Sequence, residues 1–341
     1  MIAAHRLRLF ILLLALFGIA FWFLGPGRQS KALLPPGATS ISESGDSFRA
    51  ILPLEPIPGL LPERVALGER LFHDARLSAD FSLACASCHL LHQGGVDGRR
   101  FSIGIRGAVG NINAPTVLNS GFSMVQFWDG RAASLEDQAA GPIHNPIEMG
   151  SNWQQVISRL EQDAVFKEQF LKAYSEGLTP ENIVNAIASF ERSLVTVNGR
   201  FDRYLKGEVQ ALNTLEISGY RRFSEYGCTS CHQGVLLGGN MYQKFGVLGD
   251  YFAGRAITKE DLGRFNVTGR EEDRHVFKVP GLRNVARTAP YFHDGSAVTL
   301  EQAVTVMGRY QLGRDLSAED VEVIVAFLRT LDGDVPTTGA S

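Results

Sequence analysis

Two short clusters of cysteine and histidine repeat one pattern along the chain. The first reads Cys85-Ala86-Ser87-Cys88-His89 and the second reads Cys228-Thr229-Ser230-Cys231-His232. This C-x-x-C-H spacing is the attachment signature of c-type haem, because two thiols three positions apart can each add to one vinyl group of the porphyrin while the adjacent imidazole binds the iron. The sequence therefore predicts two covalently bound haem c groups. Their attachment points are Cys85, Cys88, Cys228 and Cys231, with His89 and His232 as proximal iron ligands.

Two other uses of paired cysteines account for less of this pattern. A thioredoxin-like dithiol would need a βαβ setting, which neither pair has. A zinc site with four cysteine ligands would leave the histidine after each pair unexplained. Haem attachment uses all 4 cysteines of the chain, so it also excludes a disulfide.

The composition indicates a globular protein without a polyanionic partner. The chain has 341 residues with 45% hydrophobic and 20% charged side chains, which is enough for two domains of ordinary size. Lys and Arg number 33 against 36 Asp and Glu, a formal charge of -3. A chain with no basic excess is not expected to bind nucleic acid.

The N-terminus has the features of an export segment. Arg6 and Arg8 precede an apolar run over residues 9–24, and Gly25-Pro26 ends it. The run predicts either an uncleaved inner-membrane anchor or a cleaved signal peptide within residues 1–30, followed by a flexible linker over residues 31–50. Both alternatives place the rest of the chain in the periplasm, where c-type haem is attached.

Helix signals surround both haem motifs, whereas the period-two alternation of strands is scarce. Thr179-Pro180 begins one predicted helix, Thr299 with Gln302 forms a capping box, and Ser317 with Asp320 caps the last helix. The apolar faces expected to point inward are Trp153, Val156, Ile157 and Leu160; Ile183, Val184, Ile187, Phe190 and Leu194; and Val321, Ile324, Val325 and Leu328. These signals predict an all-α fold with long Gly-rich loops.

The two motifs lie 143 residues apart (228 − 85), about one domain's worth of chain. We therefore expect one haem domain over residues 51–197 and another over residues 198–335. The hinge between them is expected near Val197-Asn198-Gly199.

Further motifs resemble those of the bacterial di-haem cytochrome c peroxidases, and this resemblance covers about residues 50 to 333. They are Asn113-Ala114-Pro115-Thr116-Val117-Leu118-Asn119, Gln126-Phe127-Trp128-Asp129-Gly130-Arg131, Gly281-Leu282-Arg283-Asn284 and Thr288-Ala289-Pro290-Tyr291-Phe292-His293. The resemblance implies two cytochrome c-like domains joined around an interface. It also implies that the N-terminal haem reduces hydrogen peroxide and that the C-terminal haem takes electrons from a small cytochrome c or cupredoxin. A homodimer is compatible with it.

The resemblance also assigns roles to individual residues. Met307 matches the distal ligand of the C-terminal haem, and a thioether ligand favours ferrous iron. Glu148 matches the acid/base that moves a proton between the peroxide oxygens. Gln138 matches a hydrogen-bond donor to peroxide, and Trp128 matches an electron relay between the haems.

A calcium ion between the domains is implied in the same way. Asn113 matches its side-chain ligand, and Thr288 and Pro290 match its backbone-carbonyl ligands. Neutral oxygen donors suit this hard cation.

The chain departs from the family pattern at Ile105. Many members carry a histidine there, in Ser-Ile-Gly-His, that closes the N-terminal iron in the oxidised enzyme, whereas this chain reads Ser102-Ile103-Gly104-Ile105. We expect this haem to be open when oxidised unless another histidine replaces the ligand, and His144 suits that role better than His92. Two alternatives to the peroxidase remain open: an enzyme that oxidises residues of a partner protein, and a non-catalytic di-haem electron carrier.

Overall fold

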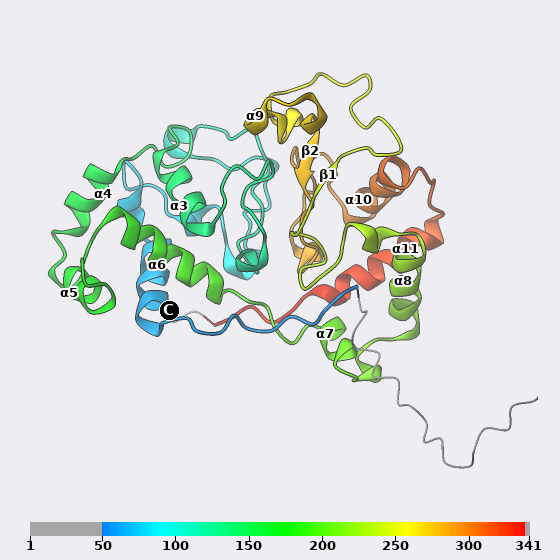
Figure 1. Cartoon of the computed structure of the whole chain (residues 1–341), viewed down its shortest axis with the longest axis horizontal. Coiled ribbons are helices and arrows are strands. Elements are labelled where there is room, and N and C mark those ends of the chain that lie inside the picture. Colours follow the sequence, from blue (N-terminus) through cyan, green and yellow to red (C-terminus); the bar gives the residue numbers. More distant parts are fainter. Residues whose placement is uncertain (1–49, 338–341) are drawn as a thin grey trace, which may run out of the picture. The chain divides into compact units, whose positions relative to one another are not determined.

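The computed structural model describes residues 50–337, which are mostly helical (Figure 1). The α-helices of this part are α2 (Pro62–Phe72), α3 (Leu135–His144), α4 (Trp153–Leu160), α5 (Ala164–Ala173), α6 (Pro180–Ser193), α7 (Arg200–Leu205), α8 (Thr214–Glu225), α9 (Phe265–Thr268), α10 (Leu300–Val306) and α11 (Ala318–Leu328). A π-helical turn, Met307–Gln311, continues α10. One short antiparallel hairpin pairs β1 (Tyr242–Lys244) with β2 (Val276–Lys278). The predicted all-α fold is confirmed, with this hairpin as a small addition.

The helices begin where their capping residues predict. Thr179 Oγ1 accepts a hydrogen bond of 3.2 Å from the Asn182 amide at the start of α6, and Ser317 and Asp320 form the capping box of α11. Thr299 caps α10 through the Gln302 amide. The Gln302 side chain, however, accepts from the Val298 amide at 2.9 Å, so the second half of the predicted capping box is displaced by one residue.

Each half of the chain contains one close helix crossing built around a glycine. A Cβ added to Gly68 in α2 would lie 1.9 Å from the carbonyl oxygen of Ala186 in α6, and one added to Gly219 in α8 would lie 1.8 Å from that of Val323 in α11. Only glycine allows backbones to approach this closely. In both halves, therefore, the helix that precedes the haem motif crosses the helix that ends the half.

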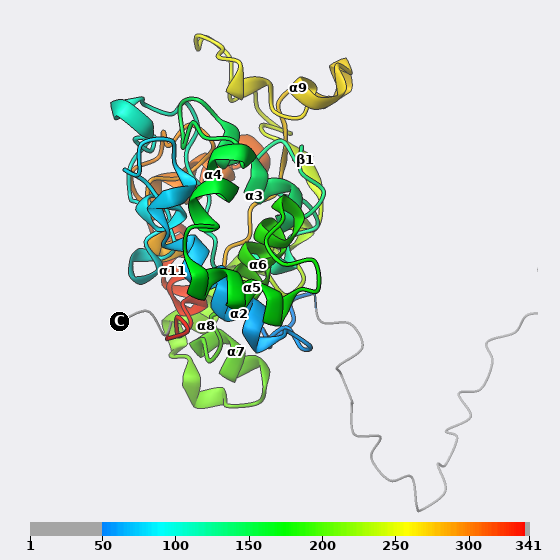
Figure 2. The same cartoon turned by 90° about the vertical axis from the view of Figure 1, so that its left-hand side faces the viewer.

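The apolar cores gather around these two crossings. Figure 1 shows α3 to α6 on one side of the described molecule and α8, α10 and α11 on the other, and Figure 2 views the molecule from the side of α3 to α6. The faces predicted for α4 and α6 pack inward. In α11 the predicted face was incomplete: Val323 and Phe327 are buried as well, and Val321 is only partly buried. This helix is enclosed more fully than its sequence period indicated.

The terminal segments of the described chain cross between the two halves. Near the start, Ile51 bridges to Gly234 and belongs to the core of the C-terminal half. The Leu52 carbonyl accepts from Arg283 Nη2 at 3.0 Å. Near the end, Val335 packs against the cluster around Phe72 in the N-terminal half. We call residues 50–60 and 332–337 the terminal straps.

The predicted export segment and most of the predicted linker lie outside the described residues. Within residues 50–337, no helix is both long enough and apolar enough to span a membrane.

Candidate functional site

The two C-x-x-C-H motifs fold into the same compact turn. Cys85–Ser87 and Cys228–Ser230 each form one turn of 3-10 helix. The His89 amide donates to the Cys85 carbonyl at 3.0 Å, and the His232 amide donates to the Cys228 carbonyl at 2.9 Å. All four thiols are free of disulfides. Each turn thus gathers two thiols and one imidazole at one place, as haem attachment requires.

Both histidines are oriented by a backbone carbonyl. His89 Nδ1 lies 3.1 Å from the Gly95 oxygen, and His232 Nδ1 lies 2.9 Å from the Leu237 oxygen. Burial lowers the pKa of both imidazoles, so they are neutral at pH 7. A neutral imidazole that donates from Nδ1 keeps its Nε2 lone pair for a metal. These residues fit an axial haem ligand in each half.

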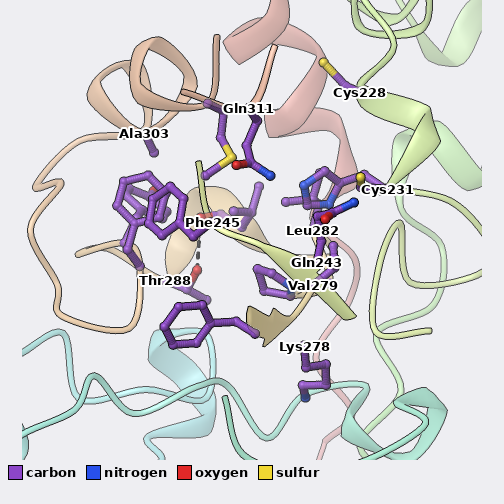
Figure 3. Close-up of a pocket in the computed structure, with 18 of the residues that line it drawn as sticks. Cys228, Cys231, Gln243, Phe245, Lys278, Val279, Leu282, Thr288, Ala303 and Gln311 are labelled. Atoms are coloured by element: carbon purple, nitrogen blue, oxygen red, sulfur yellow. Dashed lines mark hydrogen bonds between the residues drawn. The ribbon is translucent and has the colours of Figure 1, made fainter. Parts of the chain in front are cut away.

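A cavity of about 590 Å³ opens beside the second motif, and we call it the C-terminal cavity (Figure 3). Cys228, Cys231, His232 and Met307 all line it. Its volume lies within the usual range for cofactor sites. Most of the lining is apolar, and it includes Phe245, Phe277 and Tyr291. The thiols, the imidazole and the thioether therefore share one enclosure that fits a covalent haem with His and Met ligands.

A second, polar pocket of about 370 Å³ lies at the C-terminal end of α3, and we call it the Glu148 pocket. Its lining consists of Phe127, Arg131, Ala132, Asp137, Gly141, Pro142, Asn145 and Glu148. Asn145 Nδ2 donates to Glu148 Oε1 at 2.6 Å. Burial raises the pKa of Glu148, against the opposing effects of the Asn145 hydrogen bond and the Arg131 charge. A carboxyl group tuned toward neutral pH in this way can both accept and donate a proton.

The structure places the other two predicted pocket residues differently. Gln138 is partly buried in α3 and does not line the Glu148 pocket in this conformation, although it lies one turn before Pro142, which does. Trp128 lines the C-terminal cavity instead. Its Nε1 donates to the Asn113 carbonyl at 2.9 Å. Trp128 thereby connects two segments of the N-terminal half that both line the C-terminal cavity.

The loop that departs from the family pattern runs along the Glu148 pocket. The Ile105 amide donates to the Glu148 carbonyl at 2.8 Å, and the Ile105 side chain is buried. His144 is exposed, and its ring contacts that of Trp153 edge to face, with 5.0 Å between the ring centroids. His92 is exposed as well. Neither histidine lines the pocket.

The residues predicted to bind calcium all belong to the wall of the C-terminal cavity. Asn113, Thr288 and Pro290 all line it. Asn113 Nδ2 donates to the carbonyls of Arg99 at 3.0 Å and Arg100 at 3.3 Å. The amide orientation is fixed by these bonds, so the Asn113 side-chain oxygen is available as a ligand. This oxygen and the carbonyls of Thr288 and Pro290 are neutral oxygen donors, the type of ligand that a hard cation takes.

Sequence reasoning missed Asn145 as a site residue. It ends α3 and holds the carboxylate three residues later, while its Oδ1 accepts from the Ile147 amide at 3.2 Å. An asparagine at a helix end followed at the third position by glutamate is the signal that could have revealed it, because Asx side chains bond to nearby positions in turns.

Comparison with known proteins agrees with this geometry. Residues 62–210 match the family model for di-haem cytochrome c peroxidase. A cytochrome c peroxidase of Escherichia coli (strain K12) is 53% identical over 285 residues, which cover 82% of this chain and 61% of that protein. The cytochrome c551 peroxidase of Nitrosomonas europaea is 48% identical over 83% of this chain and 85% of its own length.

A solved structure resembles the fold as well. A MauG-like protein associated with microbial copper homeostasis aligns with a TM-score of 0.74 at 31% identity, over 84% of this chain and 95% of that one. The chain spans less than two thirds of the E. coli relative but most of the Nitrosomonas relative. The resemblance inferred from the motifs is confirmed, and the chain belongs to the di-haem cytochrome c peroxidase family.

Proposed function

We propose that this protein reduces hydrogen peroxide to water with electrons from a small donor protein, H2O2 + 2 e⁻ + 2 H⁺ → 2 H2O. The observation that carries the proposal is the Glu148 pocket, where a partly buried carboxyl of raised pKa is held by Asn145. Cleavage of the O–O bond needs a group that takes a proton from one peroxide oxygen and gives it to the other. An electron carrier would need no such group.

The bound haem groups would pass on the electrons of the donor and would provide the iron site at which peroxide is reduced. Cys85, Cys88 and His89 would hold the N-terminal haem, and Cys228, Cys231, His232 and Met307 would hold the C-terminal haem. Glu148 would shuttle the proton, and Gln138 would donate a hydrogen bond to peroxide. Trp128 would lie on the electron path between the haems, in keeping with its place on the wall of the C-terminal cavity.

The division of labour follows the two halves of the chain. Residues 51–197 would form the peroxidatic domain and residues 198–335 the electron-accepting domain, although the terminal straps exchange between them. Calcium bound at Asn113, Thr288 and Pro290 would stabilise the segments that meet there. The donor would be a cytochrome c or cupredoxin of the periplasm, and the export segment would be either a cleaved signal or an inner-membrane tether.

The iron beside the Glu148 pocket would lack the usual protein ligand in the oxidised enzyme. Isoleucine at position 105 cannot bind iron, and neither His92 nor His144 lines the pocket. The diferric protein should therefore show a high-spin axial EPR signal and react with peroxide without prior reduction. A fully low-spin spectrum would contradict this, and His144→Ala would then test that residue as the ligand.

Steady-state and stopped-flow kinetics test the main proposal. Rapid peroxide turnover with reduced cytochrome c or cupredoxin supports it. Slow turnover, with a long-lived oxidised state that a specific protein quenches, would favour oxidation of a partner protein instead. The absence of any reaction with peroxide would leave an electron carrier.

A further inference from the structure

Lys278 is a cation on the wall of the C-terminal cavity. It ends strand β2, opposite Tyr242 in the hairpin, and its amide donates to the Trp128 carbonyl at 2.8 Å. Its side chain is partly buried at the cavity. Figure 3 shows Lys278 at the end of the cavity remote from Cys228.

No carboxylate of the described chain balances this charge. None of the residues that line the C-terminal cavity is Asp or Glu. Arg283, another cation of the lining, pairs with Asp202 at 2.8 Å, and within residues 50–337 no ion pair reaches Lys278. Burial lowers the pKa of Lys278 to about 8. Even partial burial of a cation without a partner is costly, so an anionic group of the occupant is expected beside Lys278.

Haem c has such groups at the required end of the molecule. Its thioether bonds form at the two vinyl substituents, and its two propionates lie on the opposite edge of the macrocycle. A haem attached at Cys228 and Cys231 would therefore direct its carboxylates away from these cysteines, and Lys278 lies at that end of the cavity (Figure 3).

We propose that Lys278 forms an ion pair with a propionate of the C-terminal haem and thereby sets its reduction potential. This proposal rests on haem attachment at the second motif, as in the proposed function. A fixed positive charge near the iron favours the ferrous form, which carries one positive charge less. Lys278 is thus a positioning and tuning residue for the site that receives electrons.

The test is a spectroelectrochemical titration of the holoenzyme that resolves the two haems. Lys278→Gln is expected to lower the equilibrium constant for reduction of the C-terminal haem about tenfold, or 59 mV for a one-electron couple. Lys278→Arg, which keeps the charge, should stay within about twofold of the wild type. Lys244→Gln is the matched control, because Lys244 also lines the cavity but is exposed.

Several results would overturn the proposal. They are an unchanged potential in Lys278→Gln, an equal shift in Lys244→Gln, and a shift confined to the N-terminal haem. Mass spectrometry of the second motif separates this failure from that of the proposed function. Covalent haem at Cys228 and Cys231 with no shift removes only the role of Lys278, whereas absence of that haem removes both.

Discussion

At the residue scale, the proposed peroxide chemistry depends most on Glu148. Glu148→Gln keeps the shape of the side chain but cannot carry the proton, so kcat/KM for peroxide should fall by about 10²–10⁴-fold. Steady-state peroxide consumption with a reduced donor measures the loss. Asp137→Asn, which removes another carboxyl from the same pocket, should stay within about threefold of wild type, and an equal loss there would mean that the pocket needs charge rather than a specific acid/base.

In the proposed mechanism Asn145 would act on the protonation of Glu148 through its hydrogen bond and would not touch peroxide. Its hydrogen bond favours the carboxylate, so Asn145→Ala should raise the pKa of Glu148 further. A catalytic carboxylate must be deprotonated to accept the first proton, and the acidic limb of the kcat/KM profile should therefore move to higher pH by about one pH unit. Arg131 and Asp137, the other charged groups of the pocket, remain in place.

A general loss of activity at every pH, with the acidic limb unmoved, would contradict this role for Asn145. Asn145→Asp provides a further control. It replaces the donor with an acceptor, so it should move the limb in the same direction as alanine while it preserves the size of the side chain.

At this scale, site residues that depend on local spacing could be predicted from the sequence, and those that depend on distant segments could not. The haem ligands follow from local spacing, since one turn of chain brings Cys85, Cys88 and His89 together without help from distant residues. Lys278 has no such signal. The walls of the C-terminal cavity come from segments far apart in the chain. Only the folded structure therefore shows that Lys278 has no carboxylate beside it within the described chain.

At the scale of elements, the crossing of α8 with α11 depends on the missing side chain of Gly219. In an ordinary helix Gly→Ala stabilises by about 1 kcal/mol. Here the new Cβ would meet the Val323 carbonyl at 1.8 Å, so Gly219→Ala should instead destabilise the protein by about 1–3 kcal/mol. Thermal unfolding of the holoprotein measures the sign directly, and Gly68→Ala should behave alike at the crossing of α2 with α6.

The helices themselves were largely predictable because their caps and apolar periods are local signals. The hairpin was not. Each strand is three residues long, too short for an alternating pattern to be visible, and its pairing joins segments more than thirty residues apart. The full enclosure of α11 also could not be read from its sequence, because Val323 and Phe327 are buried by partners from α8 and the rest of the C-terminal core.

At the scale of the whole molecule, calcium should couple stability to the junction of the halves. The backbone amide of Asn113 donates to the His293 carbonyl at 2.7 Å, and the backbone carbonyl of Asn113 accepts from Trp128 Nε1. Chelation by EDTA should therefore lower the Tm of the holoprotein by about 5–10 °C. This range assumes that free Ca²⁺ is present at about 100 times its Kd before EDTA is added. Added Ca²⁺ should restore the Tm, whereas Mg²⁺ should not.

Asn113→Ala should have a low Tm that no longer responds to either EDTA or Ca²⁺. A wild-type Tm unaffected by EDTA would rule out a bound calcium ion at this site. The sequence alone supplied the ligand types through the family resemblance, but the fixed orientation of the Asn113 amide depends on carbonyls of a separate loop.

The terminal straps restrict the movement of one half of the molecule relative to the other. The first described residues insert into the core of the C-terminal half, and the last described residues pack on the N-terminal half. The two halves are therefore joined by a terminal strap at each end of the described chain. A movement that separates the halves would require both terminal straps to detach first. The straps would thereby keep the distance between the two haem groups constant during electron transfer.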